Sequence, residues 1–339
     1  MSITARPRAR NSSASMFVTL VTQGYLARMA THIDPARFEV HRSDVRGFDQ
    51  AFVHERSRRG SPAPALVCVH GWPESKRIFW KVIEPLAAAG FDVIVPDLRG
   101  FGESGLAADG FYDTPSHARD LYALVHDHLG YESAVLLGGD LGGPVIQEMA
   151  LRWPDFVSRM VLFNSPLPYD KERMDGIAGT RPPRESSDYF IRQGTDADAL
   201  ASELATGAER RRYIATFYSS RFWAHPGSFD SAEIDFHTEP FARAESLRAS
   251  FGGYESVFDA ARRSEPPMLG RNSRTRTLIL FGPSDHVIYP AFDLMAAQVF
   301  DDHVGPFLLR DCGHFVPWES PHAMVSATVA FCADLLTQP

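Results

Sequence analysis

Three short apolar runs, each followed at once by a loop rich in glycine or charge, constrain the fold of this chain more than any other feature. They lie at residues 65–69, 92–96 and 134–137. Continuously apolar runs of this length are typical of strands buried on both faces, and the segments between them have helical character. This alternation predicts an α/β fold with a mostly parallel sheet flanked by helices.

Further apolar runs complete the predicted sheet. Those at residues 160–163, 277–281 and 306–309 continue its parallel part. Phe38–His41 and Phe52–His54 flank a turn, and this pattern indicates an antiparallel pair of strands at the edge.

The segment between the two groups of strands has a different character. Residues 166–266 are polar, helical and rich in aromatic side chains, without a buried-strand pattern, and they predict an inserted helical cap. The expected parts are an N-terminal tail with a short helix, the first part of the core, the cap, and the second part of the core, at residues 1–35, 36–165, 166–266 and 267–339. In the tail, polar residues interrupt an apolar stretch at 17–29, which favours a short docking helix over a signal peptide.

Composition excludes several classes of function. The formal charge is −8, from 34 basic and 42 acidic side chains, which argues against nucleic-acid binding through a basic face. No apolar run reaches the roughly 18 residues of a membrane span. Cys68, Cys312 and Cys332 are odd in number and far apart, which favours the reducing cytoplasm over a disulfide framework. No phosphate-binding glycine loop and no Cys/His metal cluster occurs, so no cofactor and no metal are expected. A homodimer is compatible with the sequence.

The loop after the third apolar run has the spacing of a nucleophile elbow. In the segment Gly138–Gly143 the sequence is Gly-Gly-Asp-Leu-Gly-Gly, and a tight strand-to-helix turn of this kind lifts its central side chain above the sheet. That residue is Asp140, whose carboxylate can attack carbon and form an alkyl ester. Taken alone, the motif also fits an aspartate that caps the following helix.

Two downstream residues favour the catalytic interpretation. Asp285 follows a buried strand 285 − 140 = 145 residues after Asp140, and His314 follows the last strand 314 − 285 = 29 residues later. The order nucleophile, acid, histidine is that of the α/β-hydrolase fold. A histidine base needs an orienting carboxylate, and Asp285 is placed to provide it.

A second loop supplies the expected oxyanion hole. His70-Gly71-Trp72-Pro73 follows the first apolar run, and the backbone N–H groups of Trp72 and Leu141 are predicted to hold an oxyanion. The alternative is an ordinary strand-to-helix turn with a structural tryptophan.

Taken together, the His70–Pro73 loop, the Asp97–Ser104 loop, the Asp140 elbow, Asp285 and His314 resemble an α/β-hydrolase-fold epoxide hydrolase. The resemblance runs from about Phe38 to the C-terminus. It implies an inserted cap that provides two tyrosines to hold the epoxide oxygen, and the segments around Tyr189 and Tyr254 match these positions. Tyr213 and Tyr218 are expected to pack within the cap, and the Asp97–Ser104 loop to brace the site.

The resemblance also implies a reaction. Asp140 would open a small apolar epoxide to form an ester, and water activated by His314 would release a vicinal diol, as in detoxification. Haloalkane and haloacid dehalogenases share the aspartate elbow. By resemblance, the residue after the nucleophile holds the halide and is Trp in the haloalkane enzymes and Arg in the fluoroacetate enzymes, whereas this chain has Leu141. A dehalogenase is therefore the enzymatic alternative, and a non-catalytic binding scaffold is the other. One departure is Gly139, where many relatives carry His, and a slightly different pocket floor is expected.

Overall fold

The computed structural model describes residues 33–168, 170–178, 188–288 and 290–337. The chain divides into two compact units, Met1–Pro35 and Ala36–Pro339, and the sheet with all helices named below belongs to the second unit. The predicted helix at residues 17–29 lies outside the described residues, as does Tyr169. The predicted boundaries at 165 and 266 fall inside the second unit and stay predictions.

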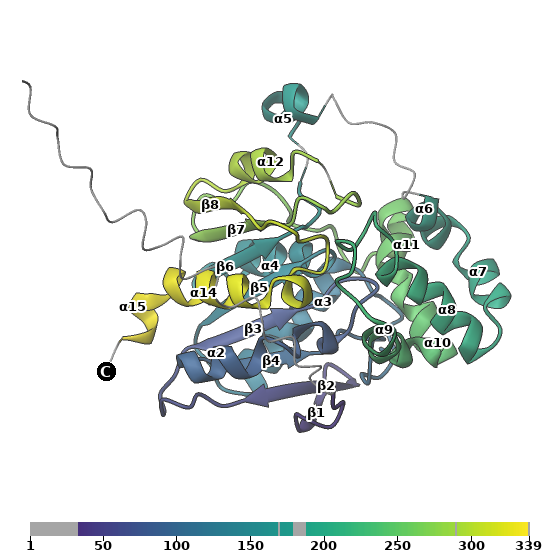
Figure 1. Cartoon of the computed structure of the whole chain (residues 1–339), viewed down its shortest axis with the longest axis horizontal. Helices are drawn as coiled ribbons and strands as arrows, with labels where there is room; N and C mark the ends of the chain where they lie inside the picture. The colour runs from purple at the N-terminus through teal and green to yellow at the C-terminus, as the bar shows by residue number, and fades with distance from the viewer. Residues whose placement is uncertain (1–32, 169, 179–187, 289, 338–339) are drawn as a thin grey trace, which may run out of the picture. The chain divides into compact units, whose positions relative to one another are not determined.

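The centre of the second unit is an eight-stranded sheet with the order β1-β2-β4-β3-β5-β6-β7-β8 (Figure 1). The strands are β1 (Val40–Val45), β2 (Phe48–Glu55), β3 (Ala65–Val69), β4 (Asp92–Pro96), β5 (Ala134–Gly139), β6 (Val157–Phe163), β7 (Thr277–Phe281) and β8 (His303–Leu308). Only the β1–β2 and β2–β4 pairs are antiparallel. The predicted mostly parallel sheet is confirmed, and each predicted apolar run forms a strand.

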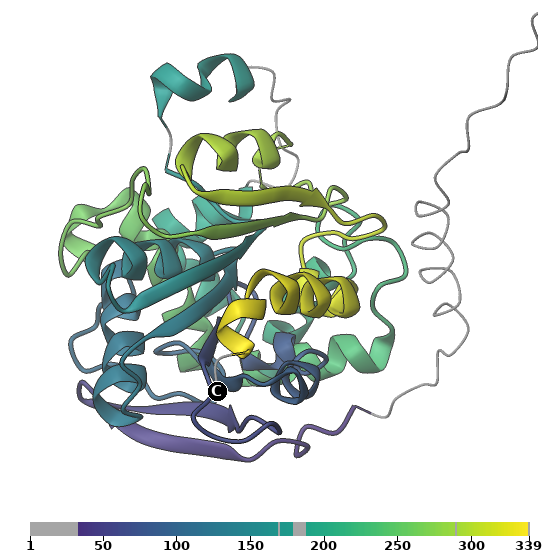
Figure 2. The same ribbon diagram turned by 90° about the vertical axis from the view of Figure 1, so that its left-hand side faces the viewer.

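Helices cover both faces of this sheet (Figure 2). Helix α4, which follows Asp140, packs on β5 and β6 and against α3, while α14 packs against α2 and β7. These core helices are η2 (Lys76–Phe79), α2 (Ile83–Ala89), α3 (Thr114–Tyr122), η3 (Ala123–His128), α4 (Gly142–Arg152), α12 (Phe292–Val299), α13 (Val316–Glu319), α14 (Pro321–Phe331) and α15 (Ala333–Leu336). The fold is therefore the predicted α/β-hydrolase arrangement.

The described residues of the connection between β6 and β7 form short helices joined by turns and loops, and no named strand lies among them. Its helices are α5 (Lys171–Ala178), α6 (Asp188–Thr195), α7 (Ala197–Glu203), α8 (Gly207–Tyr218), α9 (Ser231–Thr238), η4 (Glu239–Ala242), α10 (Ala244–Ser250), α11 (Gly252–Phe258) and η5 (Ala260–Arg262). Helices α6–α11 gather at one end of the sheet, whereas α5 packs against α12 (Figure 1). Capping boxes begin two of them, Thr206 with Glu209 at α8 and Asp230 with Glu233 at α9.

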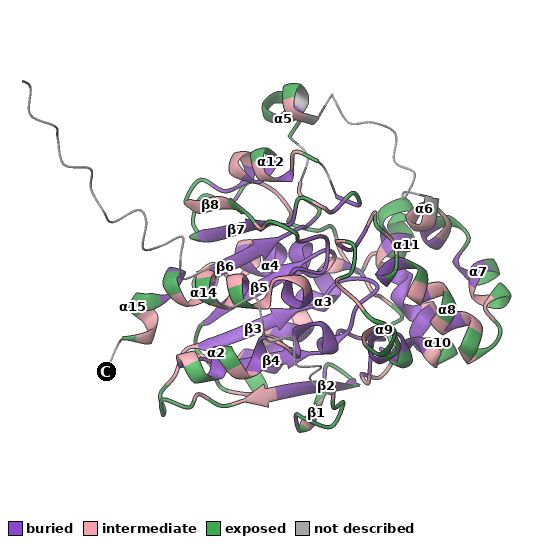
Figure 3. Cartoon of the chain, viewed as in Figure 1, coloured by how far each residue is buried: buried purple, intermediate pink, exposed green. Residues whose placement is uncertain are grey.

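Burial separates the layers clearly (Figure 3). Every residue of β3, β4, β5 and β7 is buried, as expected of parallel strands covered on both faces. The register aligns Val69 of β3 with Gly138 of β5. Because both strands end at this level, the loop after β3 and the turn after β5 begin side by side, which brings Trp72 and Asp140 together.

Candidate active site

The turn after β5 holds Asp140 in a backbone conformation that L-residues rarely adopt. Its φ is +43°, its N–H donates to the Asn164 carbonyl at 2.9 Å, and its own carbonyl accepts from Gly143 N–H at 3.1 Å. The turn is packed so closely that a Cβ on Gly142 would lie 2.2 Å from the Val69 carbonyl oxygen. The glycines around Asp140 are therefore required by sterics, and Asp140 itself is buried, with 5% of the residue exposed.

The loop after β3 provides a hydrogen-bond donor to this carboxylate. Trp72 N–H donates to Asp140 Oδ1 at 2.7 Å. A Cβ on Gly71 would lie 2.5 Å from Oδ1 and 2.8 Å from the Leu141 nitrogen, so glycine permits this approach. The predicted donor Trp72 thus faces the predicted nucleophile, and the Leu141 nitrogen lies on the same side of it.

His314 lies between two carboxylates. Its Nδ1 is 2.8 Å from Asp285 Oδ2, and its Nε2 is 3.2 Å from Asp140 Oδ2 without hydrogen-bond geometry. Asp285 is fixed in turn, because its Oδ1 accepts from Val287 N–H at 2.6 Å. The three residues that were selected by chain order meet in one buried cluster.

The charges around His314 decide its resting protonation. Burial alone would lower the pKa of His314, but the carboxylates of Asp285 and Asp140 raise it well above its usual value. At neutral pH the imidazolium form is therefore favoured while Asp140 carries its negative charge.

Asn164, at the end of β6, is a central residue of the site that the sequence analysis missed. Its Nδ2 donates to Asp285 Oδ2 at 2.9 Å and to the Gly282 carbonyl at 3.0 Å, while its Oδ1 accepts from Gly282 N–H at 2.8 Å. Its carbonyl also holds Asp140 N–H. The available signal was its position directly after a buried strand, the same signal that selected Asp285.

Tyr189 from α6 and Tyr254 from α11 are brought together, although they are 254 − 189 = 65 residues apart. Their ring centroids are 5.9 Å apart, and both rings pack on Trp72. Burial raises the pKa of both phenols well above the usual value, with Asp140 adding to the effect, so both stay protonated at neutral pH. The buried Tyr254 hydroxyl has no partner of hydrogen-bond geometry among the described residues.

The other cap tyrosines pack as expected, with one difference. Tyr213 contacts Phe217 and accepts a hydrogen bond from Gln193 at 2.9 Å. Tyr218 stacks on Phe315, but its buried hydroxyl also donates to the Pro73 carbonyl at 2.7 Å. Tyr218 therefore ties α8 to the loop that carries the Trp72 donor, which its residue type and helical position did not indicate.

Phe163 fills the space beside Gly139. A Cβ on Gly139 would lie 2.2 Å from the Phe163 ring and 2.6 Å from the Phe163 carbonyl oxygen. A larger residue at this position would need the ring to move. The structure thus gives a steric reason for Gly139 at this position, and the expected change in the pocket floor stays a prediction.

The Asp97–Ser104 loop and Glu74 contact the loops around the site and have no place in the catalytic cluster. The Asp97 carboxylate accepts from Lys76 Nζ at 2.6 Å, and Arg99 pairs with Asp120 at 2.5 Å, so the Asp97–Ser104 loop is braced by buried ion pairs. Glu74 accepts from Gly71 N–H at 2.7 Å, and burial raises its pKa to about 7, against an opposing effect of His314. Glu74 was not singled out from the sequence.

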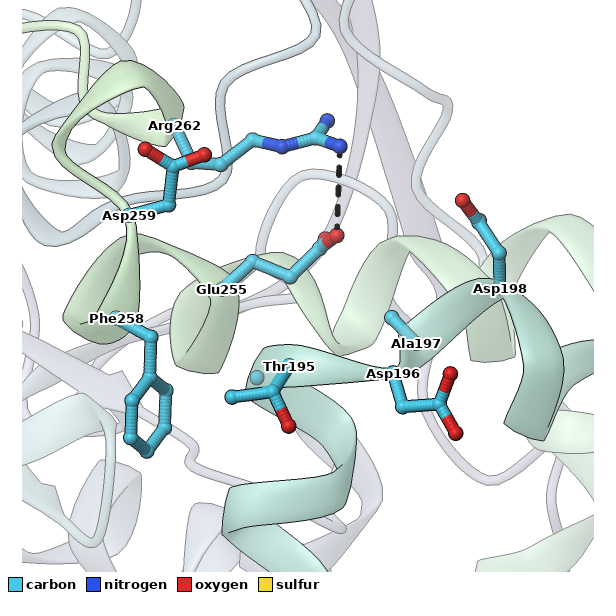
Figure 4. A pocket seen from close by; sticks show the side chains of 9 residues that line it. Thr195, Asp196, Ala197, Asp198, Glu255, Phe258, Asp259 and Arg262 are labelled. Atoms are coloured by element: carbon cyan, nitrogen blue, oxygen red, sulfur yellow. Dashed lines mark ion pairs between the residues drawn. The ribbon is translucent and has the colours of Figure 1, made fainter.

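A groove of about 430 Å³ lies between the α6–α7 and α11–η5 turns (Figure 4). Asp196, Asp198, Glu255, Asp259 and Arg262 line it, and Arg262 pairs with Glu255 at 3.7 Å. None of the predicted site residues lines this groove.

Two features of the described residues concern metal binding and membranes. Within residues 33–337 and outside the gaps, no group of three His, Cys, Asp or Glu side chains is arranged to hold a metal ion. In the part of the chain that the structure describes, each helix is too short or too polar to cross a membrane.

The fold and the site define an α/β-hydrolase, and comparison with known proteins agrees. A model of the alpha/beta hydrolase fold family matches residues 64–321. A soluble epoxide hydrolase of Corynebacterium sp. (strain C12) is 28% identical over 304 residues, which cover 87% of this chain and 97% of the other. A haloalkane dehalogenase of Bradyrhizobium diazoefficiens is 35% identical over 136 residues, covering 40% of this chain and 42% of the other.

Solved structures are similar as well. The epoxide hydrolase CorEH superposes with a TM-score of 0.73 and 24% identity, covering 88% of this chain and 100% of the other. The chain belongs to the alpha/beta hydrolase fold family. The predicted resemblance to epoxide hydrolases of this family is confirmed by these relatives, and the chain is a hydrolase.

Gly139→Ala is expected to destabilise the protein. The new Cβ meets both the ring and the carbonyl of Phe163, and overpacking of this kind costs about 1–3 kcal/mol. Gly176→Ala is the control. A Cβ at this position of α5 meets no atom within 4 Å, and alanine favours a helix over glycine. Urea unfolding should show a loss for the first variant and no loss for the second; equal midpoints would refute the steric argument.

Asn164→Ala is expected to lower both stability and activity. It leaves the Asp285 carboxylate and Gly282 N–H without this partner, which costs about 2 kcal/mol in unfolding free energy. Asn272→Ala is a matched control, because Asn272 is also a buried amide that holds loop backbone: its Oδ1 accepts from the N–H groups of Arg274 and Thr275. Both variants should lose stability, but only Asn164→Ala should lose hydrolytic activity per folded molecule. Equal activity loss would remove Asn164 from the site.

Proposed function

We propose that the protein is an epoxide hydrolase that forms an alkyl ester on Asp140 and hydrolyses it with water activated by His314. The main support is one arrangement of groups. The Asp140 carboxylate is held at Oδ1 by Trp72 N–H and faces His314 Nε2 at 3.2 Å. Burial, with Asp140 adding to it, raises the pKa of the Tyr189 and Tyr254 phenols, so both stay protonated at neutral pH. A nucleophile and two proton donors are the groups needed to open an epoxide.

In the first step, Asp140 Oδ2 attacks an epoxide carbon on the side opposite the ring oxygen. The carbon–oxygen bond breaks, and the oxygen takes a proton from Tyr189 or Tyr254. Phenols suit this role because they donate at neutral pH and tolerate a transient negative charge. The phenolate recovers its proton from the imidazolium of His314, which becomes neutral.

The loss of charge on Asp140 prepares the second step. Asp285 still raises the pKa of His314, but the second carboxylate that does so is now an ester, so the imidazolium is less strongly favoured than before. His314, oriented by Asp285, takes a proton from water, and the hydroxide attacks the ester carbonyl carbon. Collapse of the intermediate releases the diol oxygen, which takes the proton of the regenerated carboxyl group.

The oxyanion of this second step forms on Asp140 Oδ1. Trp72 N–H already donates to that atom at 2.7 Å, and we assign the second donor to Leu141 N–H. A donor of this kind contributes roughly 3–4 kcal/mol to the transition state.

The surroundings of the site support an apolar substrate. Trp72, Tyr189, Phe217 and Trp223 pack on one another beside the Asp140 carboxylate. The proposed partners are therefore a small apolar epoxide and water, and the insertion at residues 166–266 acts as the cap that encloses them.

Cys68, Cys312 and Cys332 are all free and buried, which supports the proposed location in the cytoplasm.

A dehalogenase is disfavoured at two positions. Leu141, directly after Asp140, offers a leaving halide no side-chain donor. The indole N–H of Trp72 is already directed to Ser250 Oγ at 3.1 Å. Halide release is therefore an outcome of the test and not the proposed reaction.

His314→Gln is expected to form the ester and to stall there. Incubation with styrene oxide should add the whole epoxide mass to the protein, and peptide mapping should locate it on Asp140. Asp140→Asn should remain unmodified. With 1-bromobutane, an alkyl adduct that lacks bromine would instead indicate a dehalogenase, and no adduct from any apolar epoxide would contradict the proposed function.

Tyr189→Phe combined with Tyr254→Phe is expected to abolish ester formation almost completely, because no proton donor for the epoxide oxygen remains. Tyr213→Phe is the control, since it removes a phenol of the same aromatic cluster that accepts from Gln193. Rapid-quench mass measurements in the His314→Gln background separate the variants. Unchanged ester formation in the double variant would assign the proton to another group.

A further inference from the structure

The cap contacts the catalytic histidine loop directly, through the connection between α8 and α9. In this connection the Trp223 carbonyl accepts from His314 N–H at 2.7 Å, and the Phe222 carbonyl accepts from His286 N–H at 2.9 Å. The Trp223 ring packs on the His314 ring with centroids 4.7 Å apart. A Cβ on Gly313 would lie 2.4 Å from the Trp223 carbonyl oxygen, so the two backbones are in close contact.

One carboxylate joins the two segments. Glu319, at the end of α13, accepts on Oε2 from Gly313 N–H and His225 N–H at 2.9 and 2.8 Å, and on Oε1 from Phe315 N–H at 2.9 Å. Ser228 Oγ–H also donates to Oε2 at 2.9 Å. Gly313 and Phe315 are the neighbours of His314, whereas His225 and Ser228 belong to the cap.

These contacts account for three successive N–H groups in the histidine loop. The N–H groups of Gly313 and Phe315 donate to the Glu319 carboxylate, and that of His314 donates to the Trp223 carbonyl in the cap. The loop is therefore held on one side by Glu319 and on the other by Trp223, and Glu319 also holds the cap segment. Deprotonated carboxylates accept such charge-assisted hydrogen bonds strongly.

We propose that Glu319 is a positioning residue for ester hydrolysis, which fastens the cap to the His314 loop and thereby holds His314 where it activates water. This inference rests on the proposed function. In the proposed reaction, Asp140 and the cap tyrosines open the epoxide and His314 only returns a proton to the phenolate afterwards, whereas hydrolysis depends on the position of His314. Loss of Glu319 therefore slows the second step and spares the first.

The first test compares Glu319→Gln with the wild type during turnover of styrene oxide. The amide places an N–H donor where the carboxylate accepts, so the loop loses part of its anchorage. Ester hydrolysis is expected to slow by at least about tenfold, since small displacements of a catalytic group have effects of this size. The rate of ester formation should stay within about twofold of the wild type. Ester should therefore accumulate on Asp140, as measured by quenched intact mass, with kcat and KM falling together.

Glu148→Gln is the matched control. Glu148 is a buried carboxylate that also joins the core to the segment returning from the cap, through Met268 N–H at 2.6 Å and Arg152 at 2.5 Å, but it does not contact the histidine loop. A general loss of stability or of cap docking affects both variants. Only Glu319→Gln should accumulate ester; equal accumulation in both would overturn the inference.

Ser228→Ala keeps the proposal testable if Glu319→Gln does not fold. It removes one half-exposed hydroxyl from the cap side of Glu319 and leaves the carboxylate in place. Ester should accumulate to a level between those of the wild type and His314→Gln. Ester hydrolysis at the wild-type rate in Ser228→Ala would overturn the role of the cap contact.

His314→Gln distinguishes a failure of the proposed function from a failure of the positioning role of Glu319. If it traps no ester from epoxides, the proposed function fails irrespective of Glu319. If it traps ester while Glu319→Gln hydrolyses ester at the wild-type rate, only the positioning role fails.

Discussion

The positive φ of Asp140 is the constraint on which the rest of this structure depends. A non-glycine residue in this conformation costs about 1–3 kcal/mol and persists only where its surroundings hold it. Here the surroundings are the Asn164 carbonyl on its N–H, Gly143 N–H on its carbonyl, and the β3 backbone pressed against Gly142. Because these contacts hold the turn in one backbone conformation, the carboxylate points at Trp72 N–H and at His314.

The same turn explains why distant segments act together. Asn164 holds Asp140 through its backbone and Asp285 through its side chain, so the proposed nucleophile and the proposed acid share one support directly after β6. Asp285 then orients His314, which faces Asp140. Contacts of 2.9 Å from Asn164 to Asp285, 2.8 Å from Asp285 to His314 and 3.2 Å from His314 to Asp140 therefore join these residues into one cluster.

The electrostatics of the cluster are linked to its chemistry. Burial raises the pKa of the Tyr189 and Tyr254 phenols, with Asp140 adding to the effect, whereas Asp285 and Asp140 together raise the pKa of His314. Esterification removes the Asp140 charge, which in the proposed reaction favours the change of His314 from imidazolium to base without a movement of the fold.

Sequence and structure contribute different parts of this account. Buried strands are determined by continuous apolar runs, which is why residues 65–69, 92–96 and 277–281 form strands with the expected bounds. Asp140, Asp285 and His314 could be selected because each follows a strand in the order of this fold, and the ends of parallel strands meet at one edge. Tyr189 and Tyr254 needed the family resemblance, because a helical cap gives no periodic signal for which phenol faces the nucleophile.

The remaining residues of the site could not be inferred from any local pattern. Asn164, Glu319 and Tyr218 act through hydrogen bonds to backbone groups 118, 94 and 145 positions away. Nothing in the residue types marks such pairings, since amides, carboxylates and phenols bond to whichever backbone group the fold presents. The sequence by itself therefore determined the sheet, the elbow and the order of the catalytic groups, because these follow from apolar periodicity and glycine sterics. Only the tertiary structure decided what holds them in place, because that depends on which distant backbone N–H and carbonyl groups are left to be paired.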